Sequence, residues 1–297
     1  MASLTGKSGT VSGARRWRLA LGACAALCAG MVALTALAPS AEALRVSMKR
    51  IVFEGPVRSD VITIINNSAE EQTYRLGWKR YKMTEDRALV SLEDDEDAEG
   101  VEWAEEMVRF APRRVTVPAG ASQQIRLLLR RPRDLPTGEY RAHLWIVTEE
   151  KPREFVPDDS EAQTTHSVRL SMLPAVSMPV FVRNGNLTAA ARISDLAVRH
   201  TSGTEGRVDM MLHRDGDRSL YGDVRIICTG GGTEYVAHET RGLAVYTEVT
   251  RRAMNFTYRF PAEQAANCRT VRVEYKADND DRQYGGQVMA QATASIN

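Results

Sequence analysis

Short apolar runs that alternate in twos are the feature that most constrains the fold of this 297-residue chain. Val61 to Ile65, Ile125 to Leu129 and His143 to Val147 are examples, and turn-forming stretches such as Asn66-Asn67-Ser68 and Pro118-Ala119-Gly120 separate them. A period of two is that of a β-strand with one buried face, and no long stretch has the spacing of an amphipathic helix. The pattern predicts antiparallel β-sandwiches rather than strands that alternate with helices.

We expect a boundary between two sandwiches at Arg183-Asn184-Gly185-Asn186, which combines turn-forming residues. In the first domain, 44–183, strands are expected at 45–53, 57–66, 72–82, 107–117, 121–131, 139–149 and 166–183. In the smaller second domain, 184–297, they are expected at 187–199, 206–214, 218–229, 233–239, 243–250, 254–260, 269–276 and 286–296. The number of strands in the first domain is what one immunoglobulin-like sandwich requires.

The first 43 residues have the composition of an export signal. A positively charged stretch, 15–18, precedes an apolar run, 19–38, and Ala41-Glu42-Ala43 supplies the small-x-small pattern at which signal peptidase cleaves. We therefore expect a mature chain that starts at Leu44 and has no stable membrane anchor. The apolar run is also long enough to span a bilayer, so an uncleaved anchor is the alternative.

The charge of the mature chain is close to neutral. Loss of 1–43 removes four basic residues and one acidic residue from the totals of 39 and 38, which leaves a net charge of −2. Proteins that bind nucleic acid neutralise phosphates with an excess of Lys and Arg, and this chain has no such excess. We expect no nucleic-acid partner.

Cys228 and Cys268 are the cysteines that remain after Ala43, and both belong to the second domain. In an oxidising compartment such a pair is expected to form a disulfide. Two buried thiols are the alternative. A metal site would need more ligands than two cysteines without nearby histidines supply.

No group of residues predicts catalysis, a metal or a cofactor. The chain has no Gly-x-Ser-x-Gly, no phosphate-binding loop that ends in Gly-Lys-Ser/Thr, and no His-Glu-x-x-His. The acidic run from Glu93 to Asp97 lacks the alternating ligands and the turn glycine of a calcium loop. We expect the acidic segment, which extends to Glu106, to be a solvated loop or an acidic patch on a surface that faces a partner.

A series of short motifs runs through 45–183 in a fixed order. They are Lys49-Arg50-Ile51-Val52-Phe53-Glu54-Gly55, Asn66-Asn67-Ser68, Trp78, Phe110-Ala111-Pro112, Val115-Thr116-Val117-Pro118, Gln123-Gln124-Ile125-Arg126, Leu135-Pro136-Thr137-Gly138-Glu139-Tyr140-Arg141 and Val180-Phe181-Val182-Arg183. In this order and spacing they resemble the motifs of the periplasmic pilus-assembly chaperones (PapD-like proteins). Beyond Arg183 the resemblance is reduced to Tyr221-Gly222 and Tyr284-Gly285-Gly286. It implies two immunoglobulin-like domains joined at an angle.

The resemblance also implies a function: a periplasmic chaperone, not an enzyme, that caps subunits of a pilus or another surface fibre and passes them to an outer-membrane usher. Such a subunit lacks one strand and exposes an apolar groove, which the chaperone fills with the last strand of its first domain. In this chain Val168, Leu170, Met172 and Val176 would point to one face of that strand. The same pattern fits a strand that faces its own core. Pro174 lies on the same face, and a proline belongs at a sheet edge or interrupts a strand.

Arg50 matches the family's arginine that binds the terminal carboxylate of the subunit, and one arginine can make a bidentate contact with a carboxylate. An ordinary surface arginine is the alternative. Pro179 stands where the family has the lysine that completes this site, so the second cation is missing or comes from elsewhere. Lys49 is expected to point to the opposite face.

Glu139, Arg183 and Asp281 match the ion pairs that fix the angle between the two domains in the family. Two other functions stay open. One is an exported immunoglobulin-like binding protein that has lost subunit capture. The other is a periplasmic enzyme on a sandwich scaffold, because this scaffold supports many functions.

Overall fold

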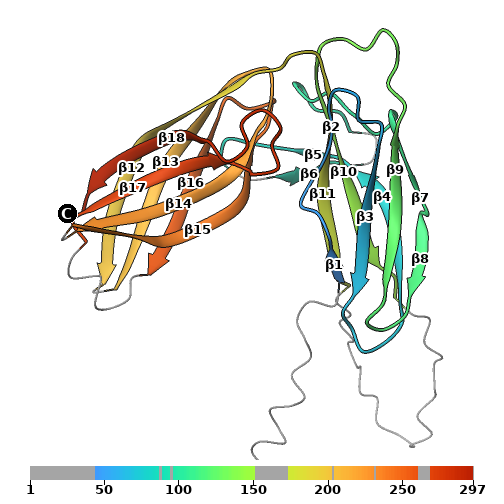
Figure 1. The fold of residues 1–297 in the computed structure, drawn as a ribbon, viewed down its shortest axis with the longest axis horizontal. Coiled ribbons are helices and arrows are strands. Elements are labelled where there is room, and N and C mark those ends of the chain that lie inside the picture. Colours follow the sequence, from blue (N-terminus) through green and yellow to red (C-terminus); the bar gives the residue numbers. More distant parts are fainter. Residues whose placement is uncertain are drawn as a thin grey trace, which may run out of the picture. The chain divides into compact units, whose positions relative to one another are not determined.

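The computed structural model of the protein describes 44–86, 89–93, 96–150, 173–202, 204–230, 232–259 and 268–296. In these ranges the regular structure is entirely β (Figure 1), and no helix is long and apolar enough to cross a membrane. The predicted signal peptide, 1–43, and Val168, Leu170 and Met172 lie outside the described residues.

The N-terminal sandwich consists of two sheets. The first sheet contains, in spatial order, β1 (Leu44–Val46), β3 (Ser59–Asn66), β9 (Ser122–Leu129) and β7 (Val108–Ala111). The second sheet contains β2 (Ile51–Phe53), β11 (Ala175–Asn184), β10 (Gly138–Thr148), β4 (Gln72–Lys79) and β8 (Arg114–Val117). These are the A-B-E-D and G-F-C strand orders of an immunoglobulin-like sandwich, with short strands added at both edges of the second sheet.

Two of the predicted strands are each divided between the two sheets. The strand expected at 45–53 consists of β1, which pairs with β3, and β2, which pairs with β11 in parallel. The strand expected at 107–117 consists of β7 and β8, which pair with β9 and β4. A strand that crosses between sheets keeps its period-two pattern, so the pattern alone did not reveal the break.

Inward-facing residues of both sheets form the core of the N-terminal sandwich. Ile62, Ile125 and Leu144 are fully buried in it. At the start of β10, the hydroxyl of Tyr140 donates a hydrogen bond to the carbonyl oxygen of Pro136 at 3.1 Å. This is the tyrosine corner of immunoglobulin-like domains. The side-chain amide of Asn66 donates to the carbonyl oxygen of Val117, which fixes the turn predicted at 66–68.

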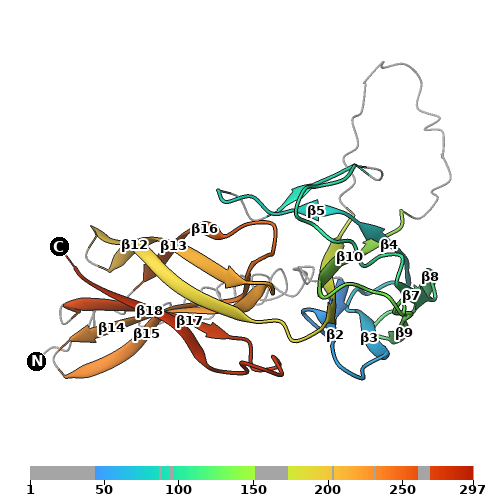
Figure 2. The same cartoon turned by 90° about the horizontal axis from the view of Figure 1, so that it is seen from above.

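The C-terminal sandwich has one sheet of β12 (Ala189–Ser202), β13 (Glu205–Gly216) and β16 (Arg251–Arg259), and another of β15 (Thr233–Val245), β14 (Leu220–Gly230), β17 (Thr270–Ala277) and β18 (Val288–Ser295). Figure 2 shows the two sheets as separate layers. The orders A-B-E and C′-C-F-G again describe an immunoglobulin-like sandwich. The prediction of an all-β fold with two such domains is therefore confirmed.

One expectation for the C-terminal sandwich was wrong. The strands predicted at 233–239 and 243–250 are a single strand, β15, up to Val245. Its pairing with β14 shifts register where Arg241 and Gly242 lie opposite Asp223, and the carboxylate of Asp223 accepts a hydrogen bond from the amide of Gly242 at 3.0 Å. A β-bulge thus accommodates residues that read as a turn in the sequence.

The predicted disulfide between Cys228 and Cys268 is present. Cys228 lies in β14, and Cys268 immediately precedes β17, the strand beside β14. The two Cα atoms are 5.7 Å apart, a usual separation for a disulfide. The bond joins neighbouring strands at one end of the sandwich.

The segment between β4 and β7, which includes the acidic residues, is folded against both sandwiches. It contains the two-stranded pair β5 (Tyr81–Lys82) and β6 (Val90–Ser91), and a small apolar cluster of Leu92, Ala98 and Val101. The backbone amide of Ala104 donates to the carbonyl oxygen of Arg141 at 3.1 Å. The expectation of a solvated loop was therefore wrong for the apolar residues. The carboxylates of Glu93, Glu96 and Glu99 belong to exposed residues, as expected.

Candidate functional site

Arg50 is buried and already has an acidic partner. It lies in the irregular segment between β1 and β2, and its side chain is 7% exposed. One guanidinium nitrogen, Nη1, lies 3.2 Å from Oδ2 of Asp278, a residue that follows β17 of the C-terminal sandwich. The guanidinium also lies over the ring of Tyr221, 4.3 Å from its centroid. The alternative of an ordinary surface arginine is therefore wrong.

Lys49 points to the same carboxylate as Arg50, contrary to expectation. Its Nζ lies 3.8 Å from Oδ2 of Asp278, while its side chain stays 57% exposed. Because the segment between β1 and β2 is not a strand, neighbouring side chains do not have to point to opposite faces. Asp278 thus receives two cations, of which one is buried and the other reaches solvent.

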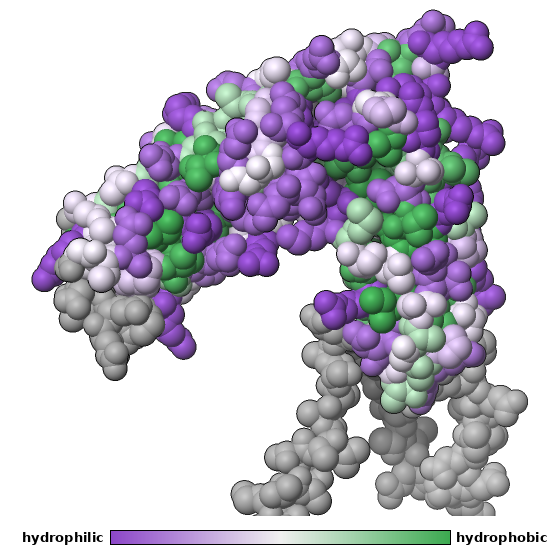
Figure 3. Space-filling view, viewed as in Figure 1, coloured by the Kyte–Doolittle hydropathy of each residue, from purple (hydrophilic) through white to green (hydrophobic). Residues whose placement is uncertain are grey.

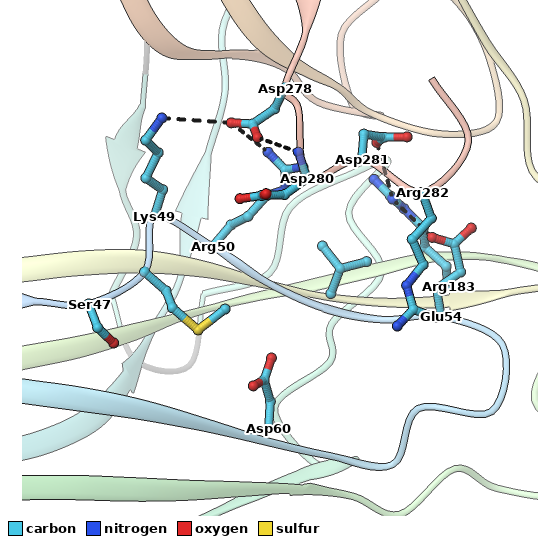
Figure 4. A pocket seen from close by; sticks show the side chains of 12 residues that line it. Ser47, Lys49, Arg50, Glu54, Asp60, Arg183, Asp278, Asp280, Asp281 and Arg282 are labelled. Atoms are coloured by element: carbon cyan, nitrogen blue, oxygen red, sulfur yellow. Dashed lines mark hydrogen bonds and ion pairs between the residues drawn. The ribbon is translucent and has the colours of Figure 1, made fainter. Parts of the chain in front are cut away.

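A pocket of about 360 Å³ adjoins this cluster (Figure 4). Charged residues of both signs line it: Lys49, Arg50, Arg183 and Arg282, and Glu54, Asp60, Asp278, Asp280 and Asp281. The pocket is therefore not a simple anion site. A carboxylate that enters it meets Lys49 and Arg50 together with Asp278, and it has to share these cations with Asp278 or displace it.

Glu139 and Arg183, predicted as an ion pair, lie side by side on β10 and β11. Nε of Arg183 donates to Oε2 of Glu139 at 2.8 Å, and both side chains are almost fully buried. The other carboxylate oxygen, Oε1, accepts a hydrogen bond from the backbone amide of Ser219 in the C-terminal sandwich at 3.1 Å. Glu139 is therefore bonded to both sandwiches.

Asp281 lies farther from Arg183 and contacts a different arginine more closely. The separation between Nη1 of Arg183 and Oδ2 of Asp281 is 3.9 Å, whereas Nη2 of Arg218 donates directly to the same oxygen. Burial opposes ionisation of Asp281, but hydrogen bonds from the amides of Tyr284 and Gln283 and the charges of Arg218 and Arg183 outweigh it, so the pKa of Asp281 is lowered.

Arg218, the central arginine of this network, was missed by the sequence reading. Its side chain is 1% exposed, and it also lies 3.8 Å from Oε1 of Glu54. It follows Asp215-Gly216-Asp217 at the end of β13, where the sequence shows only turn-forming residues. Nothing in the local pattern of residues distinguishes it from a solvated arginine.

A second buried ion pair, between Arg141 and Glu248, was also missed. Two nitrogens of Arg141 donate to the two carboxylate oxygens of Glu248 at 2.8 and 2.7 Å, and the side chains are 3% and 0% exposed. The amide of Met83 donates to the same carboxylate at 2.8 Å. The guanidinium lies 4.0 Å from the centroid of Tyr246. The two residues are 107 positions apart, and no motif links them.

β11, the described part of the predicted donor strand, has one partly open edge. β10 pairs with it from Ala175 to Asn184, whereas β2 pairs with it only from Val180 to Val182. Within the described residues, 175–179 therefore has a strand on one side only. Pro179 lies at this junction, opposite His143 of β10, and both are buried. Val176 packs against the core of the N-terminal sandwich.

The described residues contain no group of three or more His, Cys, Asp or Glu that could hold a metal ion. Ser194, Asp195 and His213 resemble a hydrolytic triad by residue type only. Nε2 of His213 lies 2.7 Å from Oγ of Ser194, but the Asp195 carboxylate also contacts this hydroxyl, at 2.8 Å. In a triad the carboxylate orients the histidine instead. The arrangement therefore provides no argument for hydrolysis.

No protein-family model matches the chain, and no curated protein matches it. Matching solved structures include the CsuC–CsuE chaperone–tip subunit complex of Acinetobacter baumannii Csu pili (10% identity, TM-score 0.43). The chaperone DraB of E. coli (13%, 0.41) and the SafA pilin–SafB chaperone complex of Salmonella enterica (11%, 0.38) also match. The alignments cover 85%, 86% and 87% of this chain and 97%, 96% and 98% of the matched chains.

Many of the matched structures are fimbrial periplasmic chaperones. At these identities and TM-scores, the likeness does not by itself assign a function to this chain.

Proposed function

We propose that this protein is a periplasmic chaperone that caps incomplete subunits of a pilus or another surface fibre by lending them a strand. The edge of β11 at 175–179, which has no second paired strand among the described residues, is the observation that carries this proposal. An unpaired strand edge presents backbone amides and carbonyls to which an incomplete sheet can add. An outer-membrane usher is the partner that receives the capped subunit in this proposal.

The direction of the side chains supports strand donation. Met178, Val180 and Val182 face the core of the N-terminal sandwich, and Val176 packs at the end of this row. Val168, Leu170 and Met172 have the same parity in the sequence. If they extend the row, their side chains fill the groove of a subunit. The N-terminal sandwich and the subunit then share one continuous apolar core.

A carboxylate anchor would use Lys49 together with Arg50. Lys49 supplies a second cation near Arg50, on the segment before β2 rather than at Pro179. The anchor is weaker than two free cations, because Asp278 already neutralises part of their charge. The ion pairs around Glu139 and Arg183 would act indirectly, since a stiff connection between the sandwiches keeps the pocket in shape.

One observation favours a second candidate, an exported immunoglobulin-like binding protein without subunit capture. Arg50, the residue expected to bind the carboxylate, is paired within the chain. If this pair never opens, Arg50 has only a structural role. The two candidates differ in whether the protein protects a subunit.

Co-expression in a bacterial periplasm tests the proposal. The exported chain is produced with candidate subunits that lack one strand, and the level of each subunit and its co-purification are measured. We expect one such subunit to be protected from degradation and to co-purify as a one-to-one complex. If no subunit level changes and no complex forms across the candidate set, the chaperone function is wrong.

Two matched pairs of substitutions locate the donor strand. Met172→Glu and Val176→Glu place a charge on the core-facing side, and we expect each to weaken the complex roughly tenfold or more, because the charge would be buried in the groove. Ser171→Glu and Ser177→Glu place the same charge on the other side and should leave it nearly unchanged. If both pairs behave alike while every variant stays folded, another strand makes the contact.

A further inference from the structure

Three exposed arginines surround an exposed leucine on the outer face of the first sheet. Leu128 of β9 is 45% exposed. Arg126 and Arg130 lie two positions before and after it on the same side of the chain, and Arg109 of β7 lies directly opposite it. We call these four residues the arginine face. In Figure 3, apolar and hydrophilic residues lie side by side on the visible part of the N-terminal sandwich.

Within the described residues no acidic residue forms an ion pair with the arginine face, although Glu105 and Glu106 line a pocket together with Arg109. None of its three guanidinium groups forms an ion pair or a hydrogen bond there, although ion pairs are frequent elsewhere in the chain. Directly opposite Arg126 lie Val61 and Ala111, which are uncharged. Like charges that are held together without an ion pair repel one another, so an acidic partner that contacts all three guanidinium groups would stabilise this surface.

The acidic segment, together with the residues back to Glu85, carries the complementary charges. Half of the positions from Glu85 to Glu106 are Asp or Glu. Glu85 and Glu105 are paired with Arg251 and Arg80. By contrast, Glu93, Glu99 and Glu102 belong to exposed residues, and their carboxylates form no ion pair with the described part of the chain.

An exposed apolar side chain lies close to these acids in the sequence. Leu89 is 37% exposed and precedes β6 of the same segment. The segment therefore combines carboxylates with an apolar group, as the arginine face combines guanidinium groups with Leu128.

We propose that the acidic segment of one molecule docks on the arginine face of a second copy of this chain. Both surfaces belong to the same polypeptide, so each molecule carries the donor and the acceptor of the contact. Arginine binds carboxylates with two parallel hydrogen bonds, and Leu89 and Leu128 supply apolar contact. A contact between two different surfaces produces an open chain of molecules unless the rotation between copies closes the assembly. A dimer in which each copy binds the arginine face of the other is one closed form.

This association depends strongly on salt, because its charges are exposed. We expect a reversible, concentration-dependent increase in mass at low ionic strength and a drop of about tenfold in the association constant near physiological salt. It does not involve the edge of β11, so it is independent of the proposed capture of subunits.

Sedimentation velocity of the exported and purified chain at about 20 mM and 150 mM salt tests the proposal. The face variant is Arg109→Glu/Arg126→Glu/Arg130→Glu, and the segment variant is Glu93→Arg/Glu99→Arg/Glu102→Arg. Each alone should remain monomeric. Mixed in equal amounts, the two variants should associate. The acidic segment of the face variant can bind the intact arginine face of the segment variant. The arginine-substituted segment of the segment variant can likewise bind the glutamate-substituted face of the face variant.

A matched control separates this contact from an effect of net charge. Arg75, Arg192 and Arg199 are exposed arginines on other surfaces that form no ion pair within the described residues. Arg75→Glu/Arg192→Glu/Arg199→Glu makes the same change in charge as the face variant and should still associate. A wild-type chain that is monomeric at all concentrations in low salt overturns the proposal, as does a mixture of the two reversed variants that does not associate.

Discussion

Two arginine–carboxylate pairs, Arg141–Glu248 and Arg50–Asp278, join the N-terminal sandwich to the C-terminal one in different ways. Arg141 makes two hydrogen bonds to Glu248, and the amide of Met83 adds a third. Arg50 approaches Asp278 with one nitrogen at 3.2 Å, beside a pocket of about 360 Å³. Both carboxylate oxygens of Glu248 accept hydrogen bonds in a buried site, whereas Asp278 lies beside a pocket with Lys49 as a second, exposed cation.

The difference shows what decides between a structural pair and a binding residue. Both arginines are mostly buried, so burial does not separate them. The number of hydrogen bonds to the carboxylate and the access to a pocket distinguish the two pairs. In the proposed anchor a ligand carboxylate competes with Asp278 for Arg50 and Lys49, whereas the oxygens of Glu248 already accept three hydrogen bonds.

Removal of the buried carboxylate should have the largest effect. Glu248→Gln leaves Arg141 without a counter-charge in an almost fully buried site, and we expect a loss of roughly 3–5 kcal/mol in the free energy of unfolding. Urea denaturation of the purified chain measures it. Glu85→Gln, which breaks the exposed pair with Arg251, is the control and should change the free energy by about 0–1 kcal/mol.

Asp278→Asn should cost less, roughly 1–3 kcal/mol, because water in the adjacent pocket can solvate Arg50. The same substitution frees both cations. We therefore expect it to increase binding of a subunit-derived peptide with a free carboxyl terminus several-fold, and to leave the amidated peptide unaffected. Equal losses of stability for Asp278→Asn and Glu248→Gln would show that the two pairs do not differ as described.

His143, which is buried near the Arg141–Glu248 pair, makes the stability of this region depend on pH. It is 1% exposed, it contacts Tyr81 and Tyr246, and neither ring nitrogen has a hydrogen-bond partner among the described residues. Burial, with a smaller contribution from the charge of Arg141, lowers its pKa from 6.5 to about 3. The unfolded chain thus binds the proton more readily than the folded one.

The stability contributed by neutral His143 is complete above pH 6.5 and is lost as the pH falls toward 3. We expect a loss of up to about 1.4 kcal/mol per pH unit in this window, which urea titrations at pH 7, 6 and 5 measure. His143→Phe keeps the ring contacts and should flatten this dependence. An unchanged slope in the His143→Phe protein would assign the pH dependence to other groups.

The sequence predicted the architecture better than the charged sites. Period-two runs and turn residues indicated both sandwiches, and the pair Cys228–Cys268 was predicted because only two cysteines remain after the signal. The break between β1 and β2 was missed, since a strand that changes sheet keeps its alternation. Arg218 and Arg141 were missed because their partners are far away in the sequence.

The donor strand shows another limit of sequence reasoning. The parity of Val176 fits both the domain's own core and the groove of a subunit, and in the free protein Val176 packs on the core. The period-two alternation is the same whether a side chain of this strand belongs to the core of the N-terminal sandwich or fills the groove of a subunit. Only the pairing of β2, which stops at Val180, indicates which part of β11 has an open edge.

Hydrogen–deuterium exchange of β11 tests the central claim most directly. The exported chain is compared alone and in a one-to-one complex with a subunit, through peptides that cover 168–179 and, as a control, β18 of the C-terminal sandwich. Strand donation predicts strong protection of the amides in 168–179 in the complex and no change in β18. A complex that forms while exchange in 168–179 stays as fast as in the free protein would contradict capping by this strand.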